Sequence, residues 1–100
     1  MIRINIIKQN NLIKSITFKG HADYDEYGKD IVCSAVSATY LCTVNAILSL
    51  NNDSIKVSNN NDLQEVVTTN DNEITQTLLN NMINCLKSLE EQYPNNVKIK

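Results

Sequence analysis

The sequence predicts an α+β fold, a two-layer sandwich in which one mainly antiparallel sheet carries two helices on one face. Apolar and polar residues alternate near the N-terminus, two stretches of about 20 residues have helical patterns, and the polar turns between elements are short. The expected order is ββαββαβ, with a last short strand around Val97 and Ile99. One hundred residues fit a single domain, 1–100.

The N-terminal elements are predicted to form an antiparallel hairpin. Ile2, Ile4 and Ile6 alternate with polar residues, which indicates a strand over 2–8 with one buried face. A polar turn follows, and a second strand is expected over 12–19. The short connection makes the two strands antiparallel neighbours.

The first helix is expected from Ile31 to about Leu50. Asp30 is a good N-cap, because its side chain can accept a hydrogen bond from the amide of Val32 or Cys33. The helix is apolar around most of its circumference, so it needs a cover on more than one side. In so small a chain, that second cover is the other helix or another subunit.

The second half repeats the strand-strand-helix layout. Strands are expected over 54–58 and 63–69, and Asn70, Asp71 or Asn72 can cap the helix that follows. This second helix ends before Pro94 and has an apolar stripe at helical spacing, made by Ile74, Leu78, Met82, Leu86, Leu89 and Tyr93.

Composition and charge narrow the function classes. The net charge is −2 and the pI is near 5.2, which argues against direct binding of nucleic acid. The N-terminus lacks the continuous apolar segment of a signal peptide. Every apolar run that approaches the length of a membrane span is interrupted by Ser, Thr or Asn. With three cysteines, a reduced cytoplasmic protein is the default expectation.

The candidate catalytic residues are Cys33 and His21, the only histidine. His21 follows the end of a predicted strand, and Cys33 falls in the first turn of the first helix. The partial positive charge of a helix N-terminus favours a thiolate, and a neighbouring imidazole can activate it as a nucleophile. From spacing alone, however, a buried structural cysteine is the commoner case.

Two residues could support such a pair. Asp30 could orient His21 as the third member of a triad, or Ser37 could do so from one turn beyond Cys33. The sequence does not choose between them. The amides at the start of the helix are also candidate oxyanion donors.

The other cysteines and the acidic loop have simpler interpretations. Cys42 and Cys85 are interpreted as buried structural residues, and no metal site or cofactor is expected, since the chain has no Cys-x-x-Cys pair. The loop before the first helix contains Asp23, Tyr24, Asp25, Glu26, Tyr27 and Gly28. It is interpreted either as solvated surface, the commoner case, or as a substrate-binding loop beside the candidate catalytic pair.

The stretch from Gly20 to Ser37 resembles a known family signature. Gly-His-Ala begins at Gly20, Asp-Ile-Val-Cys begins at Asp30, and Ala-Val-Ser ends at Ser37. At this separation the motifs closely resemble those of the Prp (YsxB-like) family of ribosomal-processing cysteine proteases. The resemblance spans the whole chain in length and element order.

The resemblance implies a role for each matching residue. Cys33 would be the nucleophile, His21 its general base and acid, and Asp30 and Ser37 supporting residues. The implied substrate is a large-subunit ribosomal protein, L twenty-seven, made with an N-terminal extension that the protease removes. The family also implies a homodimer and a mobile loop between the histidine and the cysteine.

A rival hypothesis from another class is a ribosome-associated or assembly protein that binds a ribosomal protein without cutting it. Such a binder has no need of Cys33 and His21 together. The two hypotheses therefore differ in the reactivity that they predict for the Cys33 thiol.

Overall fold

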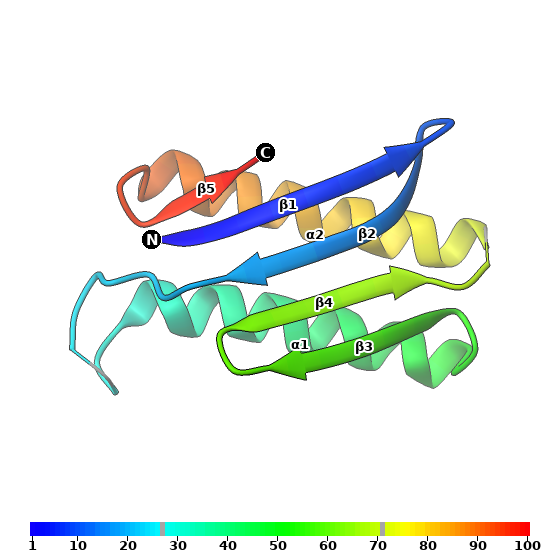
Figure 1. Ribbon diagram of the computed structural model, residues 1–100, viewed down its shortest axis with the longest axis horizontal. Coiled ribbons are helices and arrows are strands. Elements are labelled where there is room, and N and C mark those ends of the chain that lie inside the picture. Colours follow the sequence, from blue (N-terminus) through cyan, green and yellow to red (C-terminus); the bar gives the residue numbers. More distant parts are fainter. Residues whose placement is uncertain (27, 71) are drawn as a thin grey trace.

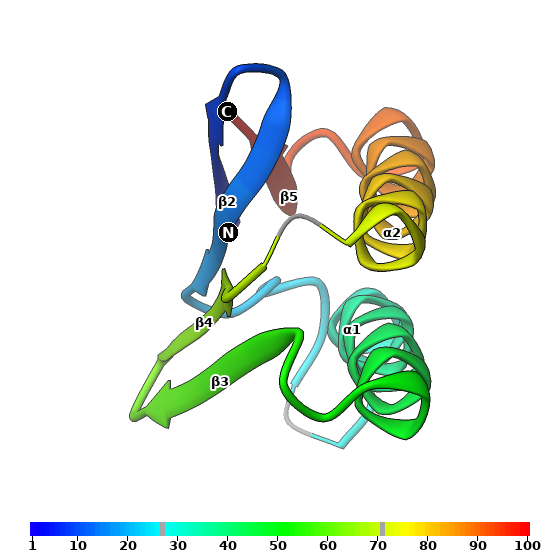
Figure 2. The same ribbon diagram turned by 90° about the vertical axis from the view of Figure 1, so that its right-hand side faces the viewer.

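The computed structural model describes residues 1–26, 28–70 and 72–100. Its elements follow the expected order and are β1 (Ile2–Gln9), β2 (Leu12–Lys19), α1 (Ile31–Leu50), β3 (Ile55–Asn60), β4 (Leu63–Thr68), α2 (Glu73–Gln92) and β5 (Val97–Ile99). Figure 1 shows the sheet in front of the two helices, and Figure 2 shows both helices on the same face of it. The predicted α+β sandwich is therefore confirmed.

The five strands form one open sheet in the order β3-β4-β2-β1-β5. All neighbours are antiparallel except β1 and β5, which are parallel. Asn10 and Asn11 join β1 to β2 with φ of 55° and 64°, the left-handed geometry that suits a two-residue hairpin turn. Because β2 lies between β1 and β4, its C-terminal end meets the turn before β4.

The core lies between the sheet and the helices. Its largest fully buried apolar side chains come from strands and both helices and are Ile4, Ile13, Ile16, Val32, Ile47, Val66, Leu79, Met82, Leu86 and Val97.

The helix α1 buries one row of side chains and exposes the opposite face. Val32, Val36, Tyr40, Val44 and Ile47 face inward, and α2 packs beside them. By length and composition alone, α1 could cross a membrane, but this inner row belongs to the core. The second cover expected for α1 is thus partly supplied by α2. Two large apolar side chains on its outer side stay exposed, namely Ile31 and Leu41, and Leu50 is exposed at the end of the helix.

The stripe expected on α2 was partly wrong. Met82 and Leu86 are buried as predicted, but Ile74 is 56% exposed, and Leu79 and Ile83 take part in the core instead. Gln76 is buried too, where its side-chain amide hydrogen-bonds to both backbone groups of Ile13 (2.8 and 2.9 Å). Ile13 lies beyond the last residue pair of β2 with β4, so the side chain of Gln76 supplies hydrogen bonds that a neighbouring strand does not make there.

Two local predictions can be settled as well. Asn72 caps α2, accepting from the amides of Ile74 and Thr75, while Asp71, another candidate cap, lies outside the described residues. The interpretation of Cys42 and Cys85 as buried was wrong, because both are exposed on the outer faces of their helices.

Candidate active site

A glycine at the end of β2 turns the chain toward the site. Gly20 has φ +90°, and a Cβ atom there would lie 2.7 Å from the carbonyl oxygen of Met1. Any L side chain would therefore meet both a strained backbone and a steric clash. The backbone amide of Gly20 donates to the carbonyl of Asp62 (3.2 Å), which fixes this corner against the turn before β4. His21 follows directly.

His21 is paired with a residue that the sequence analysis missed. Its Nε2 lies 3.0 Å from Oδ1 of Asp62, and about two-thirds of each side chain is exposed. No hydrogen bond joins His21 to Cys33 within the part of the chain that the structure describes. A ring held through Nε2 leaves Nδ1 as the nitrogen free to exchange a proton.

The topology explains why Asp62 reaches His21. Lys19 pairs with Leu63 across β2 and β4, so the residues just beyond that pair lie side by side. The signal in the sequence was a polar turn before a strand. Nothing local indicated that this strand pairs with β2, which brings together His21 and Asp62, 41 residues apart in the sequence.

Cys33 lies in the first turn of α1 and is half-buried. Its backbone amide donates to Oδ1 of Asp30 at 2.9 Å, as expected for an N-cap. The partial positive charge of a helix N-terminus favours negative charge nearby. The position thus suits a nucleophile, since the side chain is partly accessible.

Asp30 uses both carboxylate oxygens on backbone amides rather than on His21. Its Oδ2 accepts from the amides of Tyr24 (3.0 Å) and, more weakly, Asp25 (3.5 Å). Burial acts to raise the pKa of Asp30, but the amide hydrogen bonds, led by that of Cys33, outweigh it and lower the pKa below 3.8. Asp30 therefore links the loop to the helix.

The start of α1 offers fewer oxyanion donors than expected. The amide of Cys33 is engaged by the side chain of Asp30, and the amide of Ser34 donates to the carbonyl of Asp30 (3.1 Å). Ser37 is exposed one turn further on and faces the same cavities as Cys33. No hydrogen bond joins its hydroxyl to His21 among the described residues.

Two cavities meet at the thiol. One of about 160 Å³ has an apolar wall that includes Phe18, Val36 and Tyr40. The other, of about 510 Å³, is acidic and polar, and Asp23, Asp25 and Asp30 are among its lining residues. His21, Cys33 and Ser37 line both cavities. The fold thus brings the predicted thiol, imidazole and hydroxyl to a common opening.

The loop between His21 and Cys33 is held at several points. The N-terminal ammonium pairs with Asp23 (3.1 Å), and Glu26 pairs with Lys29 (2.9 Å). The ring of Tyr24 packs edge-on against Tyr93 after α2, with centroids 5.5 Å apart. Gly28 has φ +88° with open space around it, whereas Tyr27 lies outside the described residues.

Comparisons with known proteins agree with the motif. The family model described as Cysteine protease Prp matches residues 1–98. The ribosomal processing cysteine protease Prp of Staphylococcus aureus (strain Mu50) is 31% identical, with 99% of this chain and 97% of the relative covered. The same figures hold for its counterpart in strain NCTC 8325.

Solved structures give the same result. The crystal structure of the S. aureus protease Prp with a covalently linked product peptide has a TM-score of 0.94 and 29% identity, covering 100% of this chain and 98% of that one. Its complex with a substrate peptide has a TM-score of 0.87, 28% identity and the same coverage. A Streptococcus mutans protein, SMU.848, has a TM-score of 0.80, 30% identity and coverage of 100% and 92%. The chain therefore belongs to the Prp family of cysteine proteases, as the resemblance implied.

Proposed function

We propose that this chain is a cysteine endopeptidase that removes the N-terminal extension of a large-subunit ribosomal protein, L twenty-seven, during ribosome maturation. The observation that carries the proposal is the placement of Cys33 and His21 on the walls of the same two cavities. The name of the S. aureus relative and its complexes with peptides support the substrate class.

The proposed reaction is acyl transfer through the thiol. His21 takes the proton of Cys33, and the thiolate attacks the scissile carbonyl carbon to form a C–S bond. As the C–N bond breaks, the imidazolium of His21 gives its proton to the leaving amine. Water then attacks the thioester with His21 as base, which releases the new carboxylate and regenerates the thiol.

The acidic cavity supports a basic substrate. Asp23, Asp25 and Asp30 give this side of the site negative charge, and ribosomal proteins carry many lysines and arginines. Two loop carboxylates already have partners, since Asp23 binds the N-terminus and Glu26 binds Lys29. We therefore expect neutralisation of Asp23, Asp25 and Glu26 together to raise KM and weaken its salt dependence, with Asp25 contributing most.

The outer face of α1 supports a homodimer. No charged residue occurs in this helix, and Ile31 and Leu41, which lie about 80° apart on its outer side, are each more than half exposed. We expect Leu41→Glu to convert a dimer to a monomer in light scattering, because the charge would be desolvated at the interface. A wild-type monomer, or a dimer unaffected by this change, would remove the support.

The proposed enzyme works in the cytoplasm without a cofactor or metal and recognises protein rather than nucleic acid or membrane. Its net charge of −2 supports the absence of nucleic-acid contact.

The decisive experiment is intact-mass analysis of the extended ribosomal protein after incubation with wild type or Cys33→Ala. Loss of a discrete N-terminal peptide with wild type alone is the expected result. Uncut substrate that co-purifies equally with both proteins would instead favour the non-catalytic binder.

Thiol alkylation provides a second, substrate-free test. Accessibility alone predicts that Cys42 and Cys85 react first, because they are exposed and Cys33 is half-buried. An activated thiol reverses this order, and His21→Ala should slow Cys33 only. Equal or slower labelling of Cys33 in wild type would contradict the proposed pair.

A further inference from the structure

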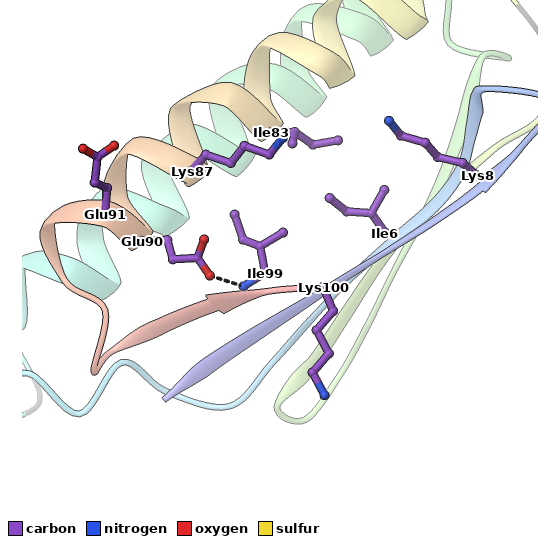
Figure 3. A pocket seen from close by; sticks show the side chains of 8 residues that line it. All are labelled: Ile6, Lys8, Ile83, Lys87, Glu90, Glu91, Ile99 and Lys100. Carbon is purple, nitrogen blue, oxygen red and sulfur yellow. Dashed lines mark hydrogen bonds between the residues drawn. The ribbon is translucent and has the colours of Figure 1, made fainter.

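A second groove lies away from the thiol, between α2 and the β5 side of the sheet. Its volume is about 770 Å³, and its floor is apolar, formed by Ile6 of β1, Ile83 of α2 and Ile99 of β5 (Figure 3). None of these three residues lines the cavities at Cys33. The groove is thus separate from the candidate active site.

The mouth of the groove is positively charged. Lys8 and Lys87 point toward one another across it from β1 and α2 (Figure 3), and neither forms an ion pair with any residue in 1–26, 28–70 or 72–100. The carboxylate of Glu90 accepts a hydrogen bond from the backbone amide of Ile99 (2.8 Å), and the side chain of Glu91 points away from the opening (Figure 3). The groove therefore offers an apolar floor next to two ammonium groups that form no ion pair with the described residues.

The same groove borders an open stretch of sheet edge. The strand β5 pairs with Ile2–Ile4 of β1, and Lys100 adds bonds to the carbonyl of Ile4 and the amide of Ile6. The strand β1 continues to Gln9, so β5 covers only part of its length (Figure 1). By alternation, the carbonyl of Ile6 and the backbone groups of Lys8 face this edge, and no strand among the described residues pairs with them.

We propose that this groove binds an extended segment of a partner protein in which an apolar residue and an acidic residue are two positions apart. Such a segment would continue the sheet along the open edge of β1. Side chains two positions apart point to the same face of a strand, here toward α2. The apolar side chain would cover Ile6, Ile83 and Ile99, while the carboxylate would lie between Lys8 and Lys87.

Peptide titrations monitored by NMR test this proposal without reference to proteolysis. The probe is acetyl-TITET-amide, in which Ile and Glu are two positions apart. Controls are acetyl-TITKT-amide, which reverses the charge, and acetyl-TTIET-amide, which places Ile and Glu on opposite faces. We expect saturable shifts of the Lys8 amide and of the methyl groups of Ile6, Ile83 and Ile99 with the first peptide only.

Charge reversal in the protein gives the matched comparison. Lys8→Glu and Lys87→Glu should each weaken binding of acetyl-TITET-amide by about fivefold. Lys56→Glu, on the exposed edge strand β3 at the other side of the sheet, should leave it unchanged. Equal binding of the three peptides, shifts confined to β3, or no shift at millimolar peptide would overturn the proposal.

Discussion

Substitution of Asp30 tests whether this residue joins the loop to α1 or instead assists proton transfer by His21. One carboxylate oxygen caps the helix at the amide of Cys33, and the other accepts from the amides of Tyr24 and Asp25. Asp30→Ala removes both sets of bonds. Asp30→Asn keeps an acceptor for the cap but turns a donor toward the loop amides.

The cost can be estimated from these contacts. Loss of an N-cap costs about 1 kcal/mol, and loss of the charge-assisted bond to Tyr24 costs about 1 kcal/mol more at this partly exposed position. We therefore expect Asp30→Ala to lower the free energy of unfolding by about 2 kcal/mol and Asp30→Asn by about 1 kcal/mol. In a domain of this size, about 2 kcal/mol corresponds to a fall in Tm of roughly 8 to 16 °C.

The effect should depend on pH in one direction. The pKa of Asp30 is lower in the folded protein than its ordinary value of 3.8, so the unfolded chain binds the proton more readily. The stabilisation is thus fully present above pH 3.8 and is lost as pH falls through the folded pKa. The difference between wild type and Asp30→Asn should shrink accordingly below pH 3.8.

Urea unfolding followed by circular dichroism suits this chain, which has no tryptophan. Asp53→Asn is the matched control, because it removes the same charge from an exposed side chain that accepts no hydrogen bond from the described residues. An unchanged unfolding free energy in Asp30→Asn, together with a fall in proteolysis approaching the 10⁴-fold of a disrupted triad, would refute the reasoning. Asp30 would then act on His21.

The remaining predictions concern the corner around His21. Asp62→Asn should lower kcat/KM for the extended ribosomal protein by at most about fivefold, because an exposed ion pair with His21 contributes about 1 kcal/mol or less; a hundredfold loss would show that the pair is essential. Gly20→Ala should destabilise the protein by about 1–3 kcal/mol in urea unfolding, since its Cβ would clash with Met1. Gly28→Ala has a similar φ but open space, so an equal loss there would show that the clash is unimportant.

The hairpin and the helix start were predictable because their causes are local. Asn10 and Asn11 tolerate left-handed backbone, so the turn between β1 and β2 is specified by two adjacent residues. The cap at Asp30 involves an amide only three residues away. Periodicity likewise fixes which side chains of β1 face the core.

The periodicity of the helices was less informative. The pattern in α2 gave its existence and length, but the buried face is rotated so that Ile74 is exposed and Leu79 and Ile83 are buried. Gln76 turns inward because its amide completes the backbone hydrogen bonding of Ile13. A polar residue that serves a distant strand is invisible to a pattern of apolar spacing.

The sequence by itself determined the order of elements, the turn at Asn10 and the cap at Asp30, because these depend on residues a few positions apart. The tertiary structure alone decided the pairing of β2 with β4, and with it the contact between His21 and Asp62. It also decided that both oxygens of Asp30 bind the backbone instead of the imidazole. Strand pairing joins segments distant in sequence, and only the packing of the whole sheet selects the partner.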